Sequence, residues 1–115
     1  MIKAGIIGAA GYTGGELIRI LLHHKKIELA FCFSRSQHGK KIHEIHSDLI
    51  GETELSFTNN LSSTVDVLFL CLPHGEAKHF LAENNFPATT KIIDLSNDYR
   101  LKENANGFIY GLPEL

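Results

Sequence analysis

Residues 2–22 read IKAGIIGAAGYTGGELIRILL, and this stretch decides how the rest of the chain is interpreted. It begins with a short apolar run, Ile2–Ile7, whose length and β-branched content predict a buried strand. It ends in a helical pattern, because four apolar residues recur at spacings that form one face: Leu17, Ile18, Leu21 and Leu22. The stretch therefore predicts a strand that leads directly into a helix.

Three glycines, Gly8, Gly11 and Gly14, separate the expected strand from the expected helix. A strand, glycine turn and helix in this order present backbone N–H groups to a phosphate at the helix N-terminus. One glycine permits the tight turn, one lets the backbone approach a pyrophosphate, and one lets helix and strand pack closely. The spacing is G-x-x-G-x-x-G instead of G-x-G-x-x-G, and glycines also occur in purely structural turns. The position after the first strand favours a nucleotide-binding turn over that alternative.

The start of the helix has a second signal, the spacing of Thr13 and Glu16. It fits a capping box with Thr13 near the N-cap and Glu16 at N3. Such a cap occupies only the N3 amide and leaves earlier amides free for an anion. We therefore expect a capped helix that still binds a phosphate.

Length and composition indicate one globular domain. The chain has 115 residues, of which 43% are hydrophobic and 21% charged. A net charge of −2 argues against nucleic acid or an anionic membrane as a partner. The N-terminus does not resemble a signal peptide, and the longest apolar run, Val67–Leu72, is too short to span a bilayer. We expect a cytoplasmic protein.

Strand and helix patterns alternate along the rest of the chain. Further strands are expected at residues 28–34, 55–58 (near a sheet edge), 65–72 and 91–95. Helices are expected around 41–47 and at 76–84, the latter with Ala77, Phe80 and Leu81 facing inward, and residues from Ser96 onward look loop-like. This alternation predicts an α/β fold, a Rossmann-like, doubly wound and mostly parallel sheet.

The end of the second strand indicates which dinucleotide fits. An NAD-binding unit places an acidic residue there to bond the ribose 2′-hydroxyl. This chain has Ser34 and Arg35 instead, and the nearest acid, Glu28, lies at the other end of the strand. A guanidinium can bind a 2′-phosphate bidentately, and a serine hydroxyl can donate to it. NADP is therefore favoured over NAD, with a solvated loop arginine as the alternative.

The two cysteines, Cys32 and Cys71, lie inside apolar runs. We expect both to be small buried hydrophobic residues and neither to be a catalytic thiolate, which needs an electropositive and partly exposed setting. His43, His46 and Asp48 have a spacing that permits a zinc site, but solvated loop histidines are common and no cysteine pair accompanies them. We expect no metal site.

Six motifs in order along the chain resemble those of N-acetyl-γ-glutamyl-phosphate reductases. They are GAAGYTG at 8–14 followed by Glu16-Leu17, Ser34-Arg35, Gly39-Lys40, LPHG at 72–75, DLSNDYRL at 94–101 and YGLPE at 110–114. The last three separate this family from its relative, aspartate-semialdehyde dehydrogenase, which has a similar glycine turn.

The resemblance implies reduction of N-acetyl-γ-glutamyl phosphate to the semialdehyde with NADPH, in arginine biosynthesis. In this family a cysteine attacks the acyl phosphate, phosphate leaves, and hydride from the nicotinamide resolves the thioester. The resemblance places that cysteine in a Gly-Cys-Tyr motif shortly beyond the Gly-Leu-Pro-Glu segment, and a catalytic histidine in a second domain. Residues 1–115 are therefore expected to form the NADP(H)-binding, N-terminal part of a larger two-domain reductase. No catalytic residue is expected within these 115 residues.

The resemblance also implies roles for individual residues. The cofactor would be bound by Gly8, Ala10, Gly11, Tyr12, Thr13, Gly14, Ser34, Arg35, Pro73, His74 and Gly75, with the last three beside the nicotinamide ribose. The acyl-phosphate substrate would lie near Ser96, Asn97 and Arg100. The full-length protein is expected to be a homo-oligomer. Two alternatives stay open: a free-standing NAD(P)-binding module for redox sensing or interaction, and a related semialdehyde dehydrogenase.

Overall fold

Six parallel strands form one sheet in the order β3-β2-β1-β4-β5-β6. The computed structural model describes residues 1–61, 64–73, 75–95 and 109–110. The strands are β1 (Ile2–Ile7), β2 (Ile27–Phe33), β3 (Phe57–Thr58), β4 (Val67–Leu70), β5 (Lys91–Asp94) and β6 (Ile109–Tyr110). This confirms the predicted Rossmann-like, doubly wound sheet.

The order of the strands creates a point at which the chain reverses its direction across the sheet. From the central β1 the chain moves outward to β2 and β3, and then returns to place β4 on the other side of β1. Ligands of open α/β sheets bind beyond the carboxyl ends of the strands at this reversal point. The topology therefore directs attention to the segments that follow β1, β2 and β4.

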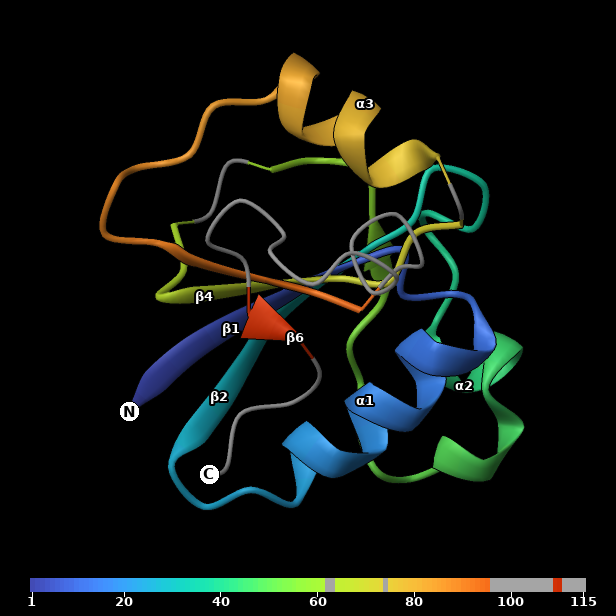
Figure 1. The fold of residues 1–115 in the computed structure, drawn as a ribbon. Coiled ribbons are helices and arrows are strands. Elements are labelled where there is room, and N and C mark those ends of the chain that lie inside the picture. Colours follow the sequence, from blue (N-terminus) through green and yellow to red (C-terminus); the bar gives the residue numbers. More distant parts are fainter. Residues whose placement is uncertain (62–63, 74, 96–108, 111–115) are drawn as a thin grey trace.

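Helices cover both faces of the sheet (Figure 1). On one face lie α1 (Tyr12–Leu22), α2 (Ile42–Ile45) and the short 3-10 helix η1 (Ser47–Leu49). On the opposite face lies α3 (Glu76–Glu83). In the part of the chain that the structure describes, no helix is long and apolar enough to cross a membrane.

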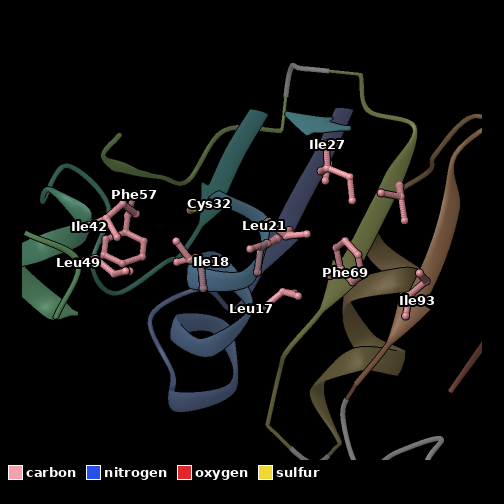
Figure 2. Packing of buried hydrophobic residues seen from close by; sticks show 14 residues of the cluster. Leu17, Ile18, Leu21, Ile27, Cys32, Ile42, Leu49, Phe57, Phe69 and Ile93 are labelled. Carbon is pink, nitrogen blue, oxygen red and sulfur yellow. The ribbon is translucent and has the colours of Figure 1, made fainter. Parts of the chain in front are cut away.

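Each face of the sheet has its own hydrophobic cluster. The α1 face buries Leu17, Ile18 and Leu21 against sheet residues that include Phe69 (Figure 2). The α3 face buries Phe80 with Phe33, whose rings meet edge to face at a centroid distance of 5.9 Å. All four residues of β4 are buried, because their side chains alternate between the two clusters. This explains why β4 is the most apolar run of the sequence.

The predicted capping box on α1 is wrong. The helix begins at Tyr12, so its N-cap is Gly11, and no side chain caps it. Thr13 therefore lies one residue into the helix, and Glu16 instead pairs with Arg19 one turn further on. The physical reason is that Gly11 is extended, with φ −78° and ψ 175°, so the turn passes directly into the helix.

The loop expected from Ser96 onward is wrong at one place. Ile109 and Tyr110 form β6, which pairs in parallel with Ile93 and Asp94 of β5. A two-residue strand is specified by its pairing partner more than by its own sequence, so periodicity gave no signal for it. The rest of that segment, residues 96–108 and 111–115, lies outside the described residues. The expected edge strand, the short helix near 41–47 and the helix at 76–84 are confirmed.

Candidate functional site

A cavity of about 650 Å³ opens at the carboxyl ends of β1, β2 and β4, at the reversal point of the sheet. Four segments line it: the glycine turn after β1, the end of β2, the segment after β4, and one side of α3. The lining residues are Gly8, Ala10, Gly11, Phe33, Ser34, Arg35, Ser36, Cys71, Leu72, Pro73, Glu76, His79, Phe80 and Glu83.

Two of the three glycines are required by the packing of the turn itself. Gly8 has φ +81°, and a Cβ there would lie 2.7 Å from the carbonyl oxygen of Cys71. A Cβ on Gly14 would lie 2.7 Å from the Cα of Ala9, so its absence lets α1 approach the turn. The N–H groups of Gly8 and Ala9 both donate to the carbonyl of Phe33 at 3.0 Å, which ties the turn to β2.

Gly11 differs from the other two glycines. Its backbone is one that any residue adopts, and the atom nearest to a Cβ built there is the carbonyl oxygen of Gly8 at 3.9 Å. The packing of the described residues therefore leaves room for a side chain at Gly11. Because Gly11 lines the cavity, a side chain there would instead occupy space at the N-terminus of α1.

The N-terminus of α1 leaves its amides free to bind an anion. The first helical bond is donated by the N–H of Gly15 to the carbonyl of Gly11, at 2.9 Å. The N–H groups of Tyr12, Thr13 and Gly14 make no hydrogen bond to the described part of the chain. The first turn contains no acidic residue. Such an end combines unsatisfied donors with the positive pole of the helix dipole.

Ser34 and Arg35 lie together at the end of β2, on the cavity wall. Ser34 is buried, and its Oγ accepts a hydrogen bond from the N–H of Gln37 at 3.2 Å, which leaves its own O–H available as a donor. The Arg35 guanidinium is exposed, and its Nη2 lies 3.6 Å from a carboxylate oxygen of Glu83 on α3. Exposed pairs of this kind contribute little stability, so the arginine can exchange this partner for another anion.

The structure brings together only some of the cofactor residues expected from the sequence. Gly8, Ala10, Gly11, Ser34, Arg35 and Pro73 share the cavity wall. Tyr12 and Thr13 are exposed on the first turn of α1, whereas Gly14 is buried beneath the turn and Gly75 is the N-cap of α3 with φ +89°. Four expected residues lie outside the described part of the chain: His74, Ser96, Asn97 and Arg100.

Sequence reasoning missed the α3 side of the cavity. Glu76, His79 and Glu83 recur at helical spacing and face it, together with the inward Phe80. The periodicity was visible in the sequence, but polar residues on a helix are typical of a solvent-exposed face. Four further cavity residues, all earlier in the chain, were not predicted as site residues: Phe33, Ser36, Cys71 and Leu72.

Both thiols are poor nucleophiles. Burial, aided by Cys71, raises the pKa of Cys32 to about 12. Burial, aided by the Asp94 carboxylate, raises the pKa of Cys71 to about 12 as well. Both thiols are therefore protonated at neutral pH. Cys71 is only partly buried and lines the cavity, so the expectation of a buried cysteine holds for Cys32 alone. That neither thiol is catalytic stays a prediction.

The histidines of the hypothetical zinc site are not arranged as ligands. Among the described residues, no three His, Cys, Asp or Glu side chains gather closely enough to hold a metal ion. The ring of His46 lies instead against the glycine turn, with its Nε2 2.8 Å from the carbonyl oxygen of Ala9.

Comparison with known families decides the identity of this domain. Residues 3–115 match the model of the family described as semialdehyde dehydrogenase, NAD binding domain. The chain belongs to this family. The cavity at the reversal point therefore lies in a nicotinamide-dinucleotide-binding domain.

Two curated relatives of this semialdehyde dehydrogenase domain carry the same name. The chain is 59% identical to the N-acetyl-gamma-glutamyl-phosphate reductase of Christiangramia forsetii and 55% identical to that of Bacteroides thetaiotaomicron. Each match covers the whole chain and 36% of the relative, so the chain spans little more than a third of their length. The resemblance found in the sequence motifs is confirmed.

A solved structure supports the fold of the domain. The crystal structure of aspartate semialdehyde dehydrogenase with NADP from Candida albicans matches with a TM-score of 0.67. The match covers 89% of this chain and 31% of that chain at 20% sequence identity.

Proposed function

We propose that residues 1–115 are the NADP(H)-binding domain of a larger reductase that converts N-acetyl-γ-glutamyl phosphate to its semialdehyde. The observation that supports the binding proposal most is the space at Gly11. The backbone there is ordinary, and the described residues leave room for a side chain in front of the free amides of α1. The substrate is proposed from the names of relatives that are up to 59% identical over the whole chain.

The pyrophosphate of the dinucleotide is proposed to bind at the glycine turn and the first turn of α1. The N–H groups of Gly11, Tyr12 and Thr13 are the donors, and none of them has an acceptor within the described residues. Gly8 and Gly14 contribute indirectly, because their missing side chains let β1, β4 and α1 converge on this point. Backbone donors held in place before binding lose little entropy when the anion arrives.

The adenosine 2′-phosphate is proposed to bind Ser34 and Arg35. The buried Ser34 hydroxyl can donate one hydrogen bond, and the exposed guanidinium can supply a bidentate, charge-assisted pair. The carboxylate of Glu83 opposes this, since it holds Arg35 and repels a phosphate. The preference for NADP over NAD is thus a balance between the guanidinium and an acid on α3.

The nicotinamide end is proposed to lie beyond β4. Pro73 lines the cavity there, and Gly75 begins α3 two residues later. By resemblance, Pro73, His74 and Gly75 flank the nicotinamide ribose, and Ser96, Asn97 and Arg100 lie near the acyl phosphate. NADPH, when bound, supplies the hydride for the reduction. The nucleophilic cysteine is expected outside this chain, because burial keeps Cys32 and Cys71 protonated. A cytoplasmic location and homo-oligomeric assembly complete the proposal.

The test is a spectrophotometric assay of NADPH oxidation with the full-length gene product. N-acetyl-γ-glutamyl phosphate and aspartyl phosphate are supplied separately, because aspartyl phosphate is the substrate expected of the related semialdehyde dehydrogenase. We expect turnover with the first compound only. Turnover with aspartyl phosphate alone would instead assign the chain to the alternative enzyme. Cofactor binding without turnover on either compound would favour the free-standing module.

A further inference from the structure

His46, at the C-terminal end of α2, reaches the glycine turn across 37 positions of sequence. Its Nε2 lies 2.8 Å from the carbonyl oxygen of Ala9. A carbonyl oxygen only accepts, so Nε2 is the protonated nitrogen and donates this hydrogen bond. The bond joins the α2 segment to the peptide between Ala9 and Ala10.

The ring of His46 is held on two further sides. A Cβ on Gly15 would lie 2.6 Å from both Cε1 and Nδ1 of the ring, so the missing side chain of Gly15 makes room for His46 on the surface of α1. On another side the ring meets Phe57 edge to face, with centroids 6.0 Å apart. Gly15 is not part of the three-glycine pattern, and its contact with His46 explains why a second glycine follows Gly14.

The hydrogen bond has a consequence for the neighbouring amide. The Ala9 carbonyl and the Ala10 N–H belong to one trans peptide, in which the two groups point in opposite directions. Because the carbonyl is directed at His46, the N–H of Ala10 is directed away from it. Ala10 lines the cavity, and its N–H has no acceptor among the residues that the structure describes.

We propose that His46 is a positioning residue of the dinucleotide site: it fixes the Ala9–Ala10 peptide so that the Ala10 N–H is aimed at the cofactor pyrophosphate. The inference rests on the proposed function. It adds a fourth backbone donor to the three at the start of α1. A peptide that is free to rotate would offer its carbonyl to the anion part of the time, so fixing it organises the site before binding.

The first test compares two variants of His46 in the full-length gene product. His46→Phe keeps an aromatic ring against Phe57 but cannot donate, whereas His46→Gln retains an N–H donor near the position of Nε2. NADPH affinity is measured by fluorescence titration and unliganded stability by thermal unfolding. We expect His46→Phe to bind NADPH roughly five- to tenfold more weakly, the order expected for one lost hydrogen bond. His46→Gln should stay within about twofold of wild type, a difference smaller than that expected for one lost hydrogen bond.

Equal affinities for wild type and His46→Phe would overturn the inference, as would equal losses in both variants. If wild type itself does not bind NADPH, the proposed function fails, and the Ala10 amide then tests the inference. Its proton signal in the unliganded protein, followed by NMR, should shift in His46→Phe and return toward wild type in His46→Gln. An unchanged Ala10 signal in His46→Phe would show that the histidine does not set this peptide.

The second test uses the contact with Gly15. Gly15→Ala should displace the ring and weaken NADPH binding by a factor similar to that of His46→Phe. In a His46→Ala background the same change meets no ring, so NADPH affinity should fall no further. Losses that multiply in the double variant would show that Gly15 and His46 act separately, which contradicts the inference.

Discussion

The variant Gly11→Val separates the proposed binding role of the glycine turn from its structural role. Among the described residues the nearest atom to a Cβ at this position is the Gly8 carbonyl oxygen at 3.9 Å, an ordinary van der Waals distance. The backbone, with φ −78°, accepts a branched residue without strain. The remaining cost is the poorer N-cap, about 1 kcal/mol of unfolding free energy. The variant should therefore fold.

The effect of Gly11→Val on binding should be much larger. A phosphate oxygen bound to backbone N–H groups lies about 2.7–2.9 Å from the nitrogens, which leaves no room for a branched side chain on Gly11. Loss of two charge-assisted hydrogen bonds at roughly 1.5–3 kcal/mol each predicts a loss of about 3–6 kcal/mol. The dissociation constant for NADPH should therefore rise by at least about a hundredfold.

The assay pairs calorimetric titration of NADPH with urea unfolding of the unliganded protein. Gly51→Ala is the matched control: Gly51 has φ +84°, no atom of the described residues lies within 4 Å of a Cβ there, and it lies outside the cavity. That variant should lose roughly 1–2 kcal/mol of stability through backbone strain and bind NADPH normally. NADPH affinity of Gly11→Val within threefold of wild type would refute a phosphate site at this turn. Loss of folding in Gly11→Val would refute the conclusion that the space next to Gly11 accommodates a side chain.

Two further variants test the proposed 2′-phosphate site, and the reactivity of the two cysteines tests their burial. Arg35→Ala should weaken NADPH binding by roughly 1.5–3 kcal/mol and change NADH binding little, as parallel titrations can measure. Equal losses for both cofactors would show that Arg35 does not bind the 2′-phosphate. Glu83→Gln should tighten NADPH about two- to fivefold at low salt and less at high salt, because it releases the exposed Arg35 and removes a like charge; salt-independent affinity would contradict this. Cys32 and Cys71 should resist iodoacetamide at pH 8 and react once urea unfolds the chain, as mass spectrometry can follow. Because the pKa of both thiols is higher in the folded protein than in the unfolded chain, they leave the unfolding free energy unchanged below about pH 8.5. As pH rises from there toward 12, the thiols ionise in the unfolded chain before they ionise in the folded protein, and the unfolding free energy should fall.

The sequence was sufficient for the elements whose burial pattern is local. The apolar run of β4 and the one-sided pattern of α1 follow directly from strands buried on both faces and a helix buried on one. The glycine spacing and the Ser34-Arg35 pair also predict two of the segments that line the cavity, because parallel strands bring their carboxyl ends to one edge of the sheet.

The other parts depended on distances that no local pattern encodes. Glu76, His79 and Glu83 look like a solvated helix face, and they face the cavity only because α3 begins at the same edge of the sheet. His46 resembled a loop histidine or a metal ligand, whereas its partner is a backbone carbonyl 37 residues away. Thr13 and Glu16 had the right spacing for a cap, but the helix had already begun at Tyr12.

The glycines of the turn thus divide by what their missing side chains make room for. At Gly8 and Gly14 the space is filled by this chain itself, by the Cys71 carbonyl and by the backbone of Ala9. At Gly15 it is filled by the ring of His46. At Gly11 no atom of the described chain comes closer than 3.9 Å, and that position faces the cavity and the free amides of α1. Substitution at the first three should therefore act on folding or on the shape of the turn, and only at Gly11 directly on the ligand.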